Sequence, residues 1–309
     1  MNGSEFVPLS LPPLLIGICA AVACAVPGNF LLLRKQALIG DAISHVVLPG
    51  IVLAFLVTGT LSAGPMMIGA GVAALVSVGL IEAIRRLGRI EPGAAMGVVF
   101  TAMFAGGVLL LEQSDTSSVH LDVEHALYGN LESLIWLDAI GWSSLLDIGA
   151  LAGLPPELMR MVLTLGAVLI LTAVFWRPLK LSTFDESFAR TLGLPVEMIG
   201  LGLVVVAAMA AVAAFDAVGS IIVIAMFICP PAAARLMTNQ LEAQVIWSVA
   251  FATASAVLGY VLAGYGPLWI GFENAVSAAG MIATVSGVIL GLAATFGPYR
   301  TRSGAPVET

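Results

Sequence analysis

The chain has 309 residues, of which 60% are hydrophobic and only 10% are charged, whereas soluble domains carry about 25% charged residues. The net charge of -7 argues against nucleic-acid binding, because phosphate contacts need clustered lysine and arginine. Apolar runs of roughly 20 residues recur along the whole chain without a polar block between them. The composition therefore predicts an all-α integral membrane protein, with residues 1–309 forming a single transmembrane domain.

Nine apolar segments have the length that a membrane-spanning helix needs. We place them at roughly residues 9–33, 41–60, 65–86, 93–112, 156–177, 195–214, 217–237, 244–264 and 276–296, each boundary being good to about two to four residues. Glycine is frequent within these segments, and small residues let helix backbones approach closely in lipid. The sequence thus predicts a compact helical bundle.

Basic residues follow every second predicted helix, which indicates the orientation under the positive-inside rule. With the N-terminus outside, the cytoplasmic side receives Arg34, Lys35, Arg85, Arg86, Arg89, Arg177, Lys180, Arg190, Arg235, Arg300 and Arg302. Arg160 alone falls near the outer face. The sequence therefore predicts nine spans with the N-terminus outside and the C-terminus inside. The link at Phe215-Asp216-Ala217 is so short that a single broken helix is an alternative there.

The second predicted helix begins with Asp41 and His45, which are four residues apart and so share one helix face. Ionisable groups are costly in hydrocarbon and mark functional sites by default. Two interpretations of Asp41 and His45 are about equally favoured. The two residues form a structural contact, within the helix or with a neighbouring helix, or they are a pair of metal ligands facing a pore. Carboxylate oxygen and imidazole nitrogen suit manganese, zinc or iron(II). Two ligands cannot complete a coordination shell, so water, other helices or a second copy on a symmetry axis must supply the rest.

Residues 113–156 form the outer segment between two spans, and four of its side chains alternate imidazole with carboxylate: His120, Asp122, Glu124 and His125. They are candidates for metal capture, although a solvated loop or a docking surface for an external partner is the favoured interpretation. The stretch from Trp136 to Leu151 is amphipathic. Its tryptophan and leucine content predicts a helix lying at the membrane interface rather than a tenth span.

Residues 180–195 form the inner segment between the fifth and sixth spans. It offers Ser182 and Thr183 as helix caps near its start and closes with Gly193 and Pro195. Hydroxyl side chains favour helix starts, and glycine and proline favour helix ends. The sequence predicts a short cytoplasmic helix here.

The chain lacks the motifs of a membrane enzyme. Its two lysines, Lys35 and Lys180, follow Arg34 and Leu179, so neither belongs to a Gly-Lys phosphate-binding loop. The sequence also contains no His-Glu-x-x-His pair and no Gly-x-Ser-x-Gly elbow. The functional element is therefore expected to be a pathway rather than a reaction centre, and Cys229 before Pro230 is interpreted as packing rather than as a ligand.

Three stretches resemble signature segments of the manganese/zinc/iron-type ABC transporter permeases. They are Ala37–Gly50, Ser182–Gly193 and Ala217–Leu236, and they occur in the same order as in that family. The resemblance runs over nearly the whole chain. It implies an importer permease of the cell inner membrane.

In such an importer, two permease copies or paralogues associate with a cytoplasmic ABC ATPase dimer, where ATP is hydrolysed, and an extracytoplasmic metal-binding protein delivers the ion. The permease binds no permanent cofactor. By the same resemblance, Asp41 and His45 are the transmembrane metal ligands. The segment from about Phe184 to Leu192 is the coupling helix, and its residues that meet the ATPase are Phe184, Asp185, Glu186 and Arg190.

Two rival functions remain open on the sequence. An ion-coupled secondary metal transporter needs no ATPase partner, and the inner segment is then only a linker. A membrane enzyme or assembly factor is disfavoured by the missing catalytic motifs. The ligand pair does not distinguish manganese, zinc and iron from one another.

Overall fold

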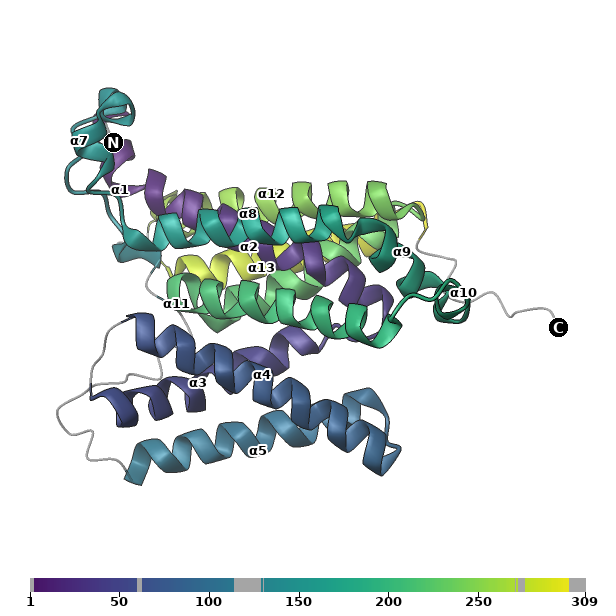
Figure 1. Ribbon diagram of the computed structural model, residues 1–309. Helices are drawn as coiled ribbons and strands as arrows, with labels where there is room; N and C mark the ends of the chain where they lie inside the picture. Colours follow the sequence, from purple (N-terminus) through teal and green to yellow (C-terminus); the bar gives the residue numbers. More distant parts are fainter. Residues whose placement is uncertain are drawn as a thin grey trace.

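The computed structural model describes residues 3–59, 63–113, 129, 131–269, 271 and 276–299, and its elements are helices (Figure 1). The α-helices are α1 (Gly3–Leu9), α2 (Leu11–Leu33), α3 (Ile39–Thr58), α4 (Ala63–Gly88), α5 (Pro92–Gln113), α7 (Ile148–Leu151), α8 (Pro156–Val174), α9 (Trp176–Phe184), α10 (Glu186–Thr191), α11 (Val196–Met237), α12 (Leu241–Trp269) and α13 (Ala278–Phe296). Two short 3-10 helices, η1 (Leu131–Ser133) and η2 (Trp142–Leu146), lie between α5 and α7.

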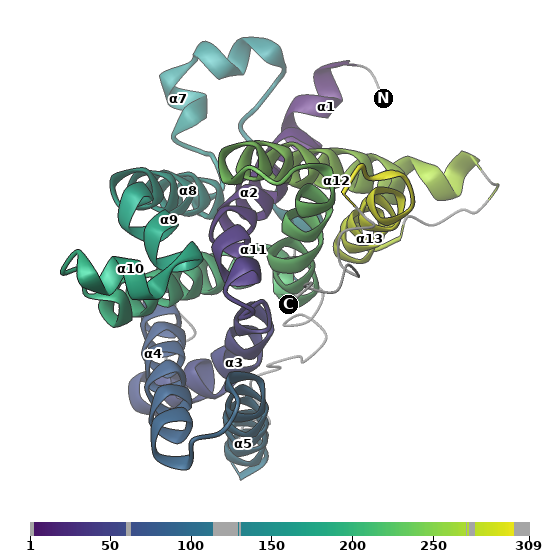
Figure 2. The same ribbon diagram turned by 90° about the vertical axis from the view of Figure 1, so that its right-hand side faces the viewer.

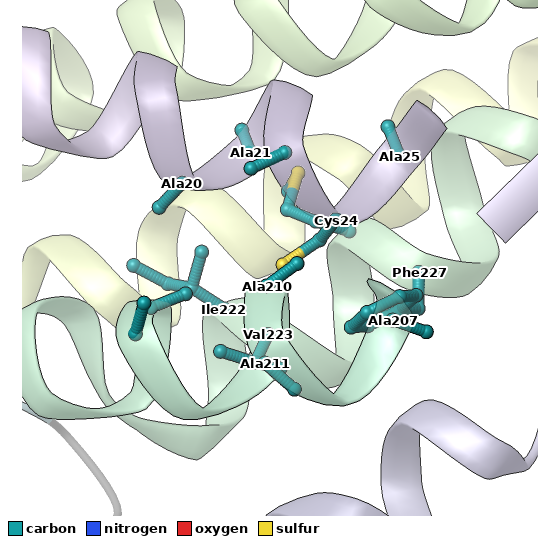
Figure 3. Close-up of a cluster of buried hydrophobic side chains, with 14 of the residues drawn as sticks. Ala20, Ala21, Cys24, Ala25, Ala207, Ala210, Ala211, Ile222, Val223 and Phe227 are labelled. Atoms are coloured by element: carbon teal, nitrogen blue, oxygen red, sulfur yellow. The ribbon is translucent and has the colours of Figure 1, made fainter. Parts of the chain in front are cut away.

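The bundle is built around α2, which packs most extensively against α11 (Figure 2). Alanines dominate this contact, so the two helices approach closely. Figure 3 shows the cluster, in which α2 contributes Ala20, Ala21, Cys24 and Ala25 and α11 contributes Ala207, Ala210, Ala211, Ile222, Val223 and Phe227. Helices α8, α12 and α13 complete this main bundle.

Helix α11 is a hairpin of two arms rather than one straight rod. Its 42 residues would extend about 63 Å, twice the thickness of the hydrocarbon core. Gly219 interrupts it with φ 79° and ψ 171°, a conformation that glycine adopts without a side-chain clash. Arg34, after the end of α2, lies against Gly200 of the first arm, while Gly28 of α2 contacts Phe227 and Pro231 of the second. Both arms therefore return to the same end of α2.

Helices α3, α4 and α5 form a sub-bundle beside the main bundle (Figures 1 and 2). Its tightest crossing joins Gly50 and Ala54 of α3 to Gly69 and Ala73 of α4. A Cβ atom on Gly69 would lie 2.6 Å from Cβ of Ala54, and one on Gly50 would lie 2.7 Å from Cβ of Ala73. The Gly-x-x-x-Ala spacing on both helices thus sets the α3–α4 distance.

This crossing predicts a destabilising effect for a single added methyl group. Gly69→Ala should lower the stability of the purified protein by about 1–3 kcal/mol, because the well-packed crossing has no room for it. Gly71→Ala on the same helix is the matched control, since a Cβ there meets nothing within 4 Å. Thermal unfolding followed by size-exclusion chromatography measures both variants. Equal melting temperatures would contradict the close crossing.

Seven described helices are long and apolar enough to cross a membrane: α2, α4, α5, α8, α11, α12 and α13. Residues Pro49–Thr58 of α3 form a shorter apolar stretch. The nine predicted segments are all helical, with the two segments at 195–214 and 217–237 forming the arms of α11. The segment predicted at 156–177 divides at Phe175, where α8 ends and α9 turns away. The number of crossings and their orientation stay predictions.

The amphipathic helix predicted between Trp136 and Leu151 is wrong. The structure contains only η2 and the four-residue α7 there, with Gly141 extended between Trp136 and η2. Trp136 is fully buried against Val7 and donates its indole N–H to the carbonyl of Ala150 at 2.8 Å. A buried tryptophan needs such a partner, so the segment folds around Trp136 instead of presenting it to lipid.

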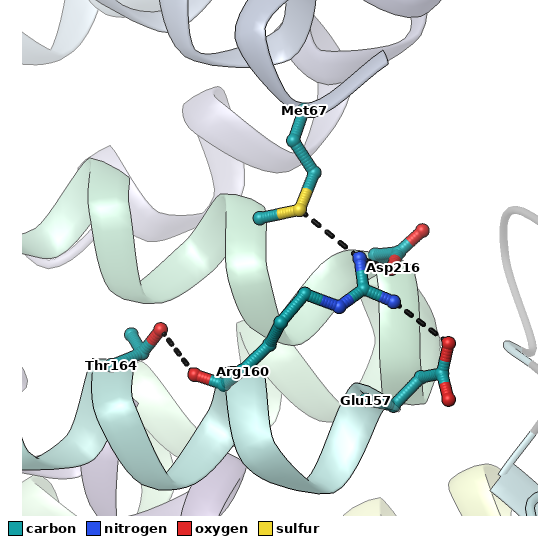
Figure 4. A network of polar contacts seen from close by, with 5 residues as sticks. All are labelled: Met67, Glu157, Arg160, Thr164 and Asp216. Atoms are coloured by element: carbon teal, nitrogen blue, oxygen red, sulfur yellow. Dashed lines mark hydrogen bonds and ion pairs between the residues drawn. The ribbon is translucent and has the colours of Figure 1, made fainter. Parts of the chain in front are cut away.

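Arg160 of α8 joins three helices at the end of the bundle where α11 bends (Figure 4). Its guanidinium pairs with Asp216 of α11 and Glu157 of α8, both at 2.7 Å, and donates to the sulfur of Met67 of α4 at 3.1 Å. Arg160 is the cation that the predicted topology places near the outer face. Its charge is compensated within the protein by two carboxylates.

Candidate functional site

The first two turns of α3 carry Asp41 and His45. Asp41 lies in the first turn of the helix, where the helix dipole stabilises a negative charge. The Nε2 atom of His45 lies 3.3 Å from Oδ1 of Asp41. The predicted common face is therefore confirmed. The side chains of His45 and Asp41 remain 33% and 28% exposed, so groups from outside this chain can reach both.

Two phenylalanines of α5 fix the imidazole of His45. The ring of Phe100 stacks on it at a centroid distance of 5.4 Å, and the ring of Phe104 meets it edge-on at 5.5 Å. These contacts leave Nε2 directed at Asp41. The sequence analysis did not identify the two phenylalanines, because their contact with His45 depends on how α3 packs against α5.

The distance between the two donor atoms fits a shared metal ion. Ligands at about 2.0–2.2 Å from one ion lie about 3.0–3.5 Å apart when they occupy neighbouring positions of its shell. The observed 3.3 Å falls in this range. Within the described ranges, no group of three or more His, Cys, Asp or Glu side chains gathers at one place. For an ion bound here, the pair would supply two ligands and the others would have to come from outside this group of residues.

The four residues proposed for outer metal capture, His120, Asp122, Glu124 and His125, lie outside the described residues. Their role stays a prediction.

The inner segment folds into the short helix that its sequence predicts, but with a different cap. Asp185, not Ser182 or Thr183, caps α10 by accepting the backbone N–H of Phe188 at 2.8 Å. Gly193 follows the helix with φ 76°, as is common after a helix end. Glu186 is exposed in the first turn, and Arg190 in the last turn lies 3.8 Å from Glu197 of α11.

Three apolar side chains project from this segment at intervals of four residues: Phe184, Phe188 and Leu192 are 54%, 50% and 56% exposed. We call them the α10 apolar stripe. Ala189 on the other side of α10 is fully buried and anchors the helix. The sequence analysis assigned Phe184 to the ATPase contact, named Leu192 only as the end of the helix and did not identify Phe188. The four-residue spacing of Phe188 and Leu192 was available as a signal.

A cavity of 610 Å³ separates α10 and the first arm of α11 from the sub-bundle. Six charged side chains of both signs line it: Arg34, Glu82, Arg85, Glu186, Arg190 and Glu197. Ile39, Ala42 and Ile43 of α3 form part of its wall, whereas His45 faces α5. The basic residues Arg34, Arg85 and Arg190, predicted to share the cytoplasmic side, thus lie at the same end of the bundle.

The chain matches a known protein family over most of its length. Residues 8–140 and 143–297 match the family described as "ABC 3 transport family". The manganese transport system membrane protein MntD of Bacillus subtilis is 39% identical over 282 residues, which cover 91% of this chain and 90% of MntD. The zinc transport system membrane protein TroD of Treponema pallidum is 36% identical, over 94% of this chain and 74% of TroD.

Solved structures resemble the fold described above. The structure of PsaBC from Streptococcus pneumoniae in complex with Fab superposes with a TM-score of 0.73 at 27% identity, covering 94% of this chain and 92% of that chain. An inward-facing conformation of a putative metal-chelate type ABC transporter gives a TM-score of 0.65 at 16% identity, over 94% and 88% of the two chains. The second similarity concerns the fold alone.

Proposed function

Because the chain belongs to the ABC 3 transport family, and is therefore a multi-pass permease component of the cell membrane, we propose that it imports a divalent transition metal. ATP hydrolysis on a separate cytoplasmic ATPase dimer drives this import. Relatives are described as manganese and zinc transport proteins. Manganese, zinc and iron(II) are the proposed substrates, and an extracytoplasmic metal-binding protein delivers them.

The observation that carries the proposal is the pair of donor atoms on α3. Oδ1 of Asp41 and Nε2 of His45 lie 3.3 Å apart and are both partly exposed, which suits transient binding of an ion rather than a closed structural site. Oxygen and nitrogen donors match the proposed metals. A second permease, as a copy or a paralogue, supplies the missing ligands across a common axis.

The α10 apolar stripe supports an ATPase-docking role for the inner segment. Exposed phenylalanine and leucine side chains at one end of a bundle favour a protein partner, and Asp185, Glu186 and Arg190 surround them with charge. When ATP closes the ATPase dimer, the two α10 helices move together and tilt the bundles. The axial metal site then opens to one face and afterwards to the other.

Family membership favours this ATP-driven importer over an ion-coupled secondary transporter. The test is ATP hydrolysis by the permease reconstituted in vesicles with its ATPase and its binding protein. We expect manganese, zinc or iron(II) to stimulate hydrolysis and to accumulate inside the vesicles. Metal accumulation that needs an ion gradient and no ATP would contradict the proposal and support the secondary transporter.

A further inference from the structure

Arg34 connects the end of α2 to the end of α9. Its Nη2 atom donates to the hydroxyl of Ser182 at 2.6 Å, and its Nε donates to the hydroxyl of Thr183 at 3.0 Å. Phe184, the first residue of the α10 apolar stripe, directly follows Thr183. One guanidinium thus holds the backbone that leads into α10.

The surroundings of Arg34 are shaped for a guanidinium. Ser182 is fully buried and donates its own proton to the carbonyl of Pro178 at 2.7 Å, which leaves its lone pairs free to accept from Arg34. Gly200 of α11 leaves space, since a Cβ there would lie 3.0 Å from Nη1. Burial lowers the pKa of Arg34 while the nearby Glu186 carboxylate raises it. Glu186, the first residue of α10, therefore interacts electrostatically with Arg34.

The connection from Arg34 to the metal ligands is short and held by backbone hydrogen bonds. Arg34 is the C-cap of α2, and α3 begins at Ile39. The N–H of Gln36 donates to the carbonyl of Leu31 at 2.8 Å, and the N–H of Ile39 donates to that of Gln36 at 3.0 Å. Asp41 follows two residues later. The connection between Arg34 and Asp41 is therefore short and held in place by backbone hydrogen bonds.

The 610 Å³ cavity leaves space for α10 and α3 to move relative to each other beside Arg34. Arg34 and Glu186 line one side of it, and Ile39, Ala42 and Ile43 of α3 line another. A closure of this cavity would bring α10 and the first turns of α3 together, with Arg34 between them. A fully packed interface would resist such a displacement.

We infer that Arg34 is the positioning residue that transmits the movement of α10 to Asp41 and His45. This inference rests on the proposed function and assigns to it a transmission point inside the permease. A second contact of α9, the ion pair between Lys180 and Glu242 of α12, is exposed on both sides. Exposed pairs of this kind contribute little, so Lys180 serves as the matched control.

The test compares Arg34→Met with Lys180→Met in the complete transporter. Arg34→Met keeps the aliphatic stem and removes the donors. We expect it to lower the manganese imported per ATP hydrolysed about 10-fold, the effect of losing roughly 1.4 kcal/mol of coupling, while the permease still copurifies with its ATPase. Lys180→Met should stay within twofold of the unmodified protein. Thr183→Val, which removes one acceptor, should give an intermediate loss.

A distance measurement separates this inference from the proposed function. Spin labels at the exposed positions Leu38 and Ser187, in a background without the native cysteines, report the separation of α3 and α10. We expect Arg34→Met to broaden this distribution and Lys180→Met to leave it unchanged, whether or not manganese is transported. An unchanged ratio of import to hydrolysis in an active transporter, or an unchanged distribution in an inactive one, would overturn the role of Arg34.

Discussion

Loss of either Asp41 or His45 is expected to abolish metal uptake while the permease still inserts into the membrane. Removing an outer-shell partner of a metal already costs about 10–100-fold in affinity, so losing a direct ligand should cost at least about 100-fold. Uptake of manganese and zinc by cells that express Asp41→Ala or His45→Ala measures the effect. Fluorescence-detected size exclusion measures the amount of folded permease.

Asp41→Asn distinguishes a metal ligand from a structural pair. The asparagine amide oxygen still accepts a hydrogen bond from His45, so a purely structural pair would tolerate the change. It lacks the negative charge that a transition metal favours, so uptake should fall with Asp41→Asn as it does with Asp41→Ala. Glu112→Gln is the control, because Glu112 is an exposed carboxylate near the far end of α5. Normal uptake by Asp41→Asn would support the structural pair.

A charge on the α10 apolar stripe is expected to uncouple the permease from its ATPase. Phe188→Asp places a carboxylate on the proposed docking surface, and desolvating an unpaired charge at an interface costs several kcal/mol. We expect copurification of the ATPase to fall more than about 100-fold and ATP-driven uptake to disappear. Adding Glu186→Lys to the Phe188→Asp variant should restore neither the copurification of the ATPase nor ATP-driven uptake. Affinity purification of the tagged permease and vesicle uptake assays measure both.

A control for the Phe188→Asp experiment tests the charge of Asp185, and it must keep the hydrogen bond by which Asp185 caps α10. Asp185→Lys would remove both the charge and the α10 cap, since Asp185 accepts the N–H of Phe188. Asp185→Asn keeps a capping oxygen and removes only the charge. ATPase binding by Asp185→Asn therefore reports the charge alone. If Phe188→Asp binds the ATPase normally, the stripe is not the docking surface.

Local patterns were enough to predict the helices and the common face of Asp41 and His45. Hydrophobic length locates each apolar helix because the bilayer core has a fixed thickness, and the spacing of Asp41 and His45 fixes their common face because a helix repeats every 3.6 residues. Both properties depend on neighbouring residues along the chain. The same is true of the short helix α10, although its cap came from Asp185 rather than from the expected hydroxyl groups.

The contacts between distant segments of the chain could not be predicted from the sequence. Burial of Trp136 against Val7 replaced the predicted interfacial helix, because the indole found its partner in the carbonyl of Ala150. The break in α11 was predicted near Phe215-Asp216-Ala217 and lies at Gly219. The small residues of α3 and α4 were visible in the sequence, but which helices they join at the crossing of Gly50 and Gly69 was not.

The sequence by itself therefore determined that this protein is a helical membrane permease with Asp41 and His45 on one face of its second long helix. Length, polarity and residue spacing are sufficient for that, since they act within single helices. Only the tertiary structure decided what surrounds the site: the phenylalanines that orient His45, the cavity beside α3, and Arg34 linking α2 to the segment before α10. These depend on packing between helices, where side chains more than fifty residues apart in the chain come into contact.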